Sequence, residues 1–143
     1  MNEHSRKLLQ ECSSGCKMAM ESMDQVEKYV QDDTLQSVIA EYRKKHDELE
    51  QKASELLAQS GNSEKEPGAA ARAFSWITTE MKMMMKEDNN QIAKLLMDGC
   101  NMGIQSITEY QHEYCEASKE AEGLADDLVK MEEEFRRELK KFL

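Results

Sequence analysis

The residues of this sequence best suited to chemistry are four side chains that could bind a metal ion: Cys16, His46, Cys100 and Met131. Thiolate, imidazole and thioether groups suit soft or borderline ions such as Cu⁺ or Zn²⁺. A helical rise of about 1.5 Å per residue brings all four to one level of an up-and-down bundle. The alternative is an ordinary core, because buried Cys acts as a small hydrophobic residue and Met fills gaps. No ligand spacing matches a known zinc motif, which favours the alternative.

A di-iron carboxylate site needs a different set of residues. Such a site takes one Glu from each of two helices and a Glu-x-x-His pair from each of the other two. Arg43 stands three residues before His46, where the paired acid should be. The only Glu-x-x-His pair, Glu109–His112, is expected to face solvent because Tyr110 belongs to the buried face of that helix. We therefore expect the chain neither to bind two iron ions nor to oxidise Fe²⁺.

Three glycines fall at the same level as the candidate metal ligands: Gly15, Gly99 and Gly103. A glycine inside a helix costs about 1 kcal/mol relative to alanine, so its presence usually has a packing or binding reason. The reason is either a close approach of two helices or room for a ligand. We favour close approach, because native cores rarely leave voids.

The elements that must position these residues are long amphipathic helices. Apolar residues alternate at steps of three and four, which predicts helices at about 3–30, 33–59 and 88–117, and a last one beginning between 118 and 124. The row of residues that faces the other helices is called the seam here. The seam of the second helix is Leu35, Ile39, Tyr42, His46, Leu49, Ala53 and Leu56. The seam of the last helix is Ala121, Leu124, Leu128, Met131, Phe135, Leu139 and Phe142, with an irregular step at Leu139.

These seams give two local predictions. The ring of His46 should lie inside the bundle, because it completes an unbroken series from Leu35 onwards. Asp33 should cap the second helix, and Asp88 the third, because an acid at the N-cap accepts a hydrogen bond from the first turn.

A polar linker at about 60–68, which holds the single proline, precedes a shorter predicted helix at about 69–86. Phe74, Ile77 and Met81 belong to its apolar stripe, whereas Trp76 and Met83 lie on another face. A helix buries a stripe only a little over 100° wide, and a second apolar face left in water is unusual in monomers. We therefore predict a homodimer whose interface includes Trp76 and Met83, since symmetric dimers are the commonest oligomers. The alternative is that both faces pack within one chain.

Three stretches resemble bacterial families of unknown function in the ferritin-like superfamily. They are YRKKHDEL at 42–49, FSW at 74–76 and GIQSITEY at 103–110. The resemblance implies an antiparallel four-helix bundle built from two hairpins, with a short Trp-bearing helix in the crossover between helices two and three. It also implies that the metal site typical of the superfamily has been lost here.

Composition limits the other possibilities. A chain of 143 residues is about one domain, and the net charge of −10 disfavours nucleic acid and anionic lipid as partners. No run is apolar enough for a membrane span, the first residues have no signal-peptide core, and the four cysteines form no disulfide pattern, so we expect a cytoplasmic protein. No catalytic motif is present either.

The sequence therefore favours one single-domain, all-α bundle over residues 1–143 that is not an enzyme and acts by protein association. The second reading is a bundle that binds a metal ion or small ligand through its buried Cys, His and Met residues. A di-iron oxidase or iron store is the least favoured.

Overall fold

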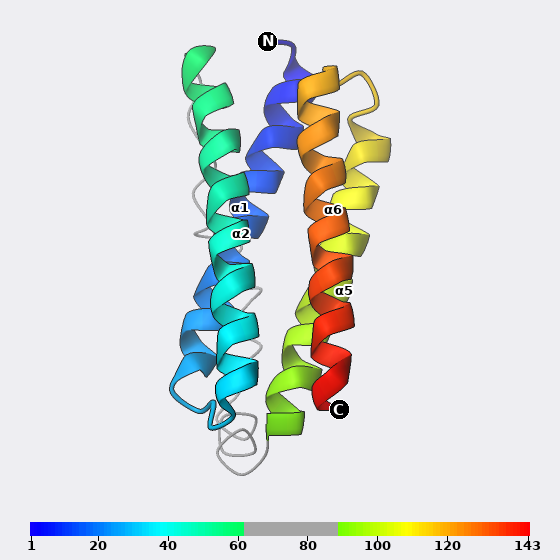
Figure 1. The fold of residues 1–143 in the computed structure, drawn as a ribbon. Coiled ribbons are helices and arrows are strands. Elements are labelled where there is room, and N and C mark those ends of the chain that lie inside the picture. Colours follow the sequence, from blue (N-terminus) through cyan, green and yellow to red (C-terminus); the bar gives the residue numbers. More distant parts are fainter. Residues whose placement is uncertain (62–88) are drawn as a thin grey trace.

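In the computed structural model, residues 1–61 and 89–143 are described, and they form four long helices (Figure 1). These are α1 (Glu3–Glu27), α2 (Asp33–Gln59), α5 (Asn89–Glu113) and α6 (Lys119–Leu139), followed by the 3₁₀ turn η1 (Lys140–Phe142). No strand occurs in the described part of the chain. The all-α prediction is confirmed for these residues.

Short polar side chains fix where three of the helices begin. Asn2 accepts a hydrogen bond from the backbone N–H of Ser5 at 2.8 Å, and Ser118 caps α6 in the same way. At α2 the cap is Asp32, whose carboxylate accepts from the N–H of Leu35 at 3.0 Å. The prediction that Asp33 caps this helix is therefore wrong by one residue. Asp33 instead lies in the first turn, where its negative charge interacts favourably with the helix dipole.

The helices form two hairpins that pack side by side. Contacts are most extensive between α1 and α2 and between α5 and α6, while α6 also contacts α1 and α2, and α1 contacts α5. The N–H of Gln31, in the α1–α2 turn, donates to the Asn89 side chain at 3.3 Å, so α2 and α5 begin at the same end. At the other end the Asn2 amide donates to the Glu116 carbonyl at 2.8 Å. The second and third long helices thus run in the same direction (Figure 1), and the contacts are consistent with a helical bundle.

One hydrophobic core runs through all four helices, and most of the predicted seam residues belong to it. Its largest fully buried apolar side chains include Leu8, Leu9, Met23, Leu35, Leu57, Ile92 and Leu139. The α2 seam ends on Leu57, with the expected Leu56 only partly buried. The first helix ends at Glu27 and α5 at Glu113, earlier than predicted, although residues beyond both ends still pack on the core.

Several predictions fall outside the described residues. They are the short helix at 69–86, almost all of the linker at 60–68, the Asp88 cap, and the proposed interface residues Trp76 and Met83. Among the helices that are described, none is long and apolar enough to cross a membrane.

Candidate functional site

A buried histidine–carboxylate pair lies inside the helices, where His46 of α2 meets Glu132 of α6. The two residues are 1% and 5% exposed, which confirms that the ring of His46 is interior. The ring's Nδ1 is 2.6 Å from the carbonyl oxygen of Tyr42, one turn earlier on α2. Its Nε2 contacts the Oε1 of Glu132. Both ring nitrogens are therefore engaged.

These partners determine how many protons the pair holds. A carbonyl oxygen only accepts, so Nδ1 must carry hydrogen and donate to Tyr42. The contact between Nε2 of His46 and Oε1 of Glu132 then needs one proton between them. The pair is either imidazolium with carboxylate or neutral imidazole with carboxylic acid. In both forms its net charge is zero, which avoids an uncompensated charge in the core.

Cys100 of α5 brings a third polar group to this pair. Burial, followed by the negative charge of Glu132 and a hydrogen bond to it, raises the pKa of the Cys100 thiol well above its usual range. Burial also raises the pKa of Cys16 on α1, with smaller contributions from Cys12 and Glu132. Both sulfurs therefore remain protonated thiols at neutral pH unless a cation replaces the proton.

Two glycines of α5 lie beside this centre. A Cβ on Gly103 would lie 3.5 Å from the carboxyl carbon of Glu132, and a Cβ on Gly99 would meet nothing within 4 Å. On α1, a Cβ at Gly15 would touch only the end of the Ile107 side chain, at 4.0 Å. The expected close approach of helix backbones at these glycines is therefore wrong. A Cβ on Gly103 would make only ordinary van der Waals contact with Glu132, so an alanine would also fit there.

A small cavity adjoins the pair and has a volume of about 30 Å³. The polar side chains that line it are Ser22, His46, Cys100 and Glu132. The rest of its lining is apolar and consists of Ala19, Met23, Leu95, Leu96, Gly99 and Phe135. That volume suits one water molecule or ion. It is about tenfold below the volume of pockets that bind organic ligands.

The four predicted metal ligands are all buried, but they do not form one group. His46 and Cys100 share the cavity, whereas Cys16 and Met131 do not line it. Within the described part of the chain, no three His, Cys, Asp or Glu side chains are arranged so that they could hold a metal ion as they stand.

Glu132 is the site residue that the sequence reading missed, although a signal was present. The predicted α6 seam included Met131 and needed an irregular step at Leu139. The series Ala121, Ala125, Leu128, Glu132, Phe135 and Leu139 alternates at four and three with no irregularity, and every member is buried. An acid on the seam of one helix and a histidine on the seam of another together indicate a buried pair of this kind.

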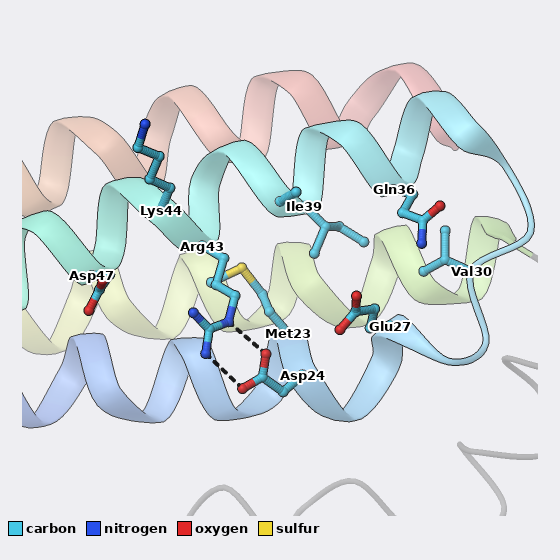
Figure 2. Close-up of a pocket in the computed structure, with 10 residues that line it drawn as sticks. Met23, Asp24, Glu27, Val30, Gln36, Ile39, Arg43, Lys44 and Asp47 are labelled. Atoms are coloured by element: carbon cyan, nitrogen blue, oxygen red, sulfur yellow. Dashed lines mark hydrogen bonds and ion pairs between the residues drawn. The ribbon is translucent and has the colours of Figure 1, made fainter.

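The residues present do not fit a di-iron carboxylate site. Arg43 reaches out to Asp24 of α1, with Nε–Oδ1 and Nη2–Oδ2 distances of 2.6 and 3.0 Å (Figure 2). Phe135 stands three residues after Glu132, where a second histidine would be required. Glu109 and His112 are exposed, as predicted.

A second hollow, of about 260 Å³, lies on the surface between α1 and α2 around the Arg43–Asp24 pair (Figure 2). Its floor includes Met23 and Ile39, and its rim carries charges of both signs. Because those charges largely compensate one another, the hollow does not select a ligand of one sign.

No known protein family, curated protein or solved structure matches this chain.

Proposed function

We propose that this chain is a ferritin-like helical bundle without a di-iron centre, and that it acts by associating with another protein chain, most simply a second copy of itself. The observation that carries the proposal is the closed interior. The polar groups of the His46–Glu132 centre satisfy one another, and the cavity beside them, at about 30 Å³, excludes an organic substrate. Function must then come mainly from the surface.

The direction of the helices supports the ferritin-like part of the proposal. Two hairpins whose second and third helices run in the same direction need a crossover connection, which is the wiring of ferritin-like bundles. Here α2 and α5 both begin beside the α1–α2 turn. The ligands of the superfamily's metal site are replaced, with Arg43 and Phe135 at two of the positions.

The apolar surplus of the sequence supports the association. In the described part of the chain, the large apolar side chains that are exposed are Met1 before α1, Met102 on α5 and Leu143 after η1. The sequence instead concentrates apolar residues between 74 and 85, and helical spacing would put Trp76 and Met83 on one face. Symmetric pairing of two such faces would remove them from water.

The test is sedimentation equilibrium of the full chain and of the double variant Trp76→Ala/Met83→Ala at micromolar concentration. We expect the wild type to be a dimer and the variant to shift by at least tenfold toward monomer. Met102→Ala is the matched control, because Met102 is an exposed methionine on α5 outside the proposed interface.

Two results would contradict the proposal. One is a double variant that dimerises as tightly as the wild type. The other is a Met102→Ala variant that weakens the dimer as much as the double variant does, which would place the interface on α5.

A further inference from the structure

The connection between α5 and α6 is held to the beginning of α1 by three hydrogen bonds, which are called the clasp here. The Asn2 amide donates to the Glu116 carbonyl at 2.8 Å, and the backbone N–H of Glu116 donates to Nδ1 of His4 at 3.1 Å. The backbone N–H of Ser118 donates to Oγ of Ser5 at 2.7 Å. Both backbone groups of Glu116 are therefore bonded to α1, which joins the two hairpins at this end of the bundle.

The ring of His4 can take part in the clasp only in its neutral form. A backbone N–H is a donor, so Nδ1 of His4 must accept and carries no hydrogen. In the imidazolium ion both ring nitrogens carry hydrogen, and two donors would then face one another. The arrangement is the reverse of that at His46, whose Nδ1 donates to a carbonyl oxygen.

We propose that His4 makes the clasp a pH-sensitive switch, which is closed while its ring is neutral and opens when the ring takes up a proton. Opening releases the α5–α6 connection from α1. The inference concerns one end of the bundle and does not depend on self-association.

The charges around His4 offer a protonated ring little in exchange for the lost hydrogen bond. The ionisable groups on the elements that meet here are Glu3, Arg6 and Lys7 of α1, Glu113 of α5, Tyr114, Cys115 and Glu116 of the connection, and Lys119, Glu120 and Glu122 of α6. Glu3 already pairs with Arg6 at 3.5 Å and with Lys7 at 3.3 Å. The carboxylates of Glu113 and Glu116 belong to exposed residues, where water and salt screen them.

The remaining contacts of this end do not depend on the protonation of His4. Its half-buried ring meets the ring of Tyr114 edge to face, with 5.8 Å between the centroids. Leu8 and Leu9, one turn further along α1, are fully buried in the apolar core. We therefore expect the connection to open while the four helices stay folded.

The direction of the pH effect follows from the neutral form. An ordinary histidine side chain is half protonated at about pH 6.5. The stabilisation that the clasp provides should therefore be present at about pH 7.5 and largely lost at about pH 5.

The experiment is an NMR titration of the full-length chain over this pH range, in which the backbone amide signals and the histidine ring signals are followed together. We expect the Glu116 amide proton to move upfield as the pH falls, with the same midpoint as the His4 ring, because its hydrogen bond is lost. The Ser118 amide signal should move with that midpoint too.

The variant His4→Asn makes the test specific, because the Asn side-chain oxygen accepts a hydrogen bond at every pH. Its Glu116 amide signal should not follow the titration. At about pH 5 its thermal midpoint should exceed that of the wild type by about 3 °C more than at about pH 7.5. His112→Asn is the matched control, because His112 is an exposed histidine on α5, and this variant should titrate as the wild type does.

Three outcomes overturn the proposal. They are a Glu116 amide signal in the wild type that does not follow the His4 ring, a His4→Asn variant in which that signal still titrates, and a His112→Asn variant in which it no longer does. The first is measured on the wild type, so the proposal can be refuted even if a variant fails to fold.

Discussion

At the scale of single residues, the centre is defined by hydrogen bonds that leave His46 no free ring nitrogen. Tyr42 fixes which nitrogen carries hydrogen, and Glu132 shares a proton with the other. The hydrogen-bonded His46–Glu132 pair has no net charge and depends on correct geometry. Its burial is therefore favourable only while both partners are present.

We predict that the two simplest changes at Glu132 differ sharply in cost. Glu132→Ala should lower the free energy of unfolding by about 3 kcal/mol, because it leaves Nε2 of His46 without a partner and opens a void. Glu132→Gln should cost about 1 kcal/mol or less, because its amide donates to the neutral ring. Urea unfolding measures both, and Glu133→Ala, at an exposed neighbouring acid, is the control. Equal costs for the two Glu132 variants would show that the hydrogen bond contributes little.

The cysteines should differ in reactivity according to burial. Burial, with a smaller contribution from Glu11, raises the pKa of Cys12 to about 12, and the pKa values of Cys16 and Cys100 are raised too. At pH 8 these thiols should therefore hold almost no thiolate, whereas Cys115 is exposed.

A thiol-reactive disulfide reagent should modify one cysteine per folded chain and four after denaturation. Cys115→Ser should remove the fast reaction entirely. Rapid modification of a second thiol in the folded wild type would show that the core around Cys12, Cys16 or Cys100 opens readily.

At the scale of elements, the residues on the inner face of each helix determine whether the His46–Glu132 centre can hold a di-iron site. On α2, Arg43 lies three residues before His46, and on α6, Phe135 lies three residues after Glu132. Neither helix therefore supplies the chelating Glu-x-x-His pair.

We accordingly predict that the chain does not bind two iron ions and does not oxidise Fe²⁺. The measurements are iron content after anaerobic loading and desalting, and oxygen consumption with Fe²⁺. Two tightly held iron equivalents, or turnover above the rate without protein, would contradict the assignment of these helix faces.

The glycines of α5 give a prediction about helix stability. Because a Cβ on Gly99 would meet nothing within 4 Å, Gly99→Ala should raise the free energy of unfolding by about 1 kcal/mol through helix propensity. Gly103→Ala should gain about as much, since a Cβ 3.5 Å from Glu132 is in ordinary van der Waals contact. Thermal unfolding of the two variants checks both expectations. A destabilised Gly99→Ala would mean that the space beside Gly99 is filled.

The sequence predicted the helices well because their seams repeat over about six turns each. His46 was placed inside for the same reason. Glu132 was not, because an acid is normally a surface residue and its burial depends on a partner 86 positions away in the chain. Likewise, Gly103 looked like a packing residue because its real neighbour, the Glu132 carboxylate, was not expected there. The periodicity of apolar residues along one helix therefore could not predict a polar pair between two distant helices.

At the scale of the whole molecule, the interior and the surface differ in charge. Among the described residues, the cavity beside the neutral His46–Glu132 pair is about 30 Å³, which is too small for an organic substrate. The surface carries a net charge of −10, which makes two copies repel one another at long range. Any self-association must therefore come from apolar contact, and added salt should strengthen it by screening the repulsion.

The mass of the purified wild-type chain in solution tests the central claim most directly. Sedimentation equilibrium over the micromolar range, at low and at moderate salt, should give twice the 16.5 kDa of one chain, with tighter association at the higher salt. A mass of 16.5 kDa at every concentration and in both salts would contradict the account, because the second apolar face would then be buried within a single chain.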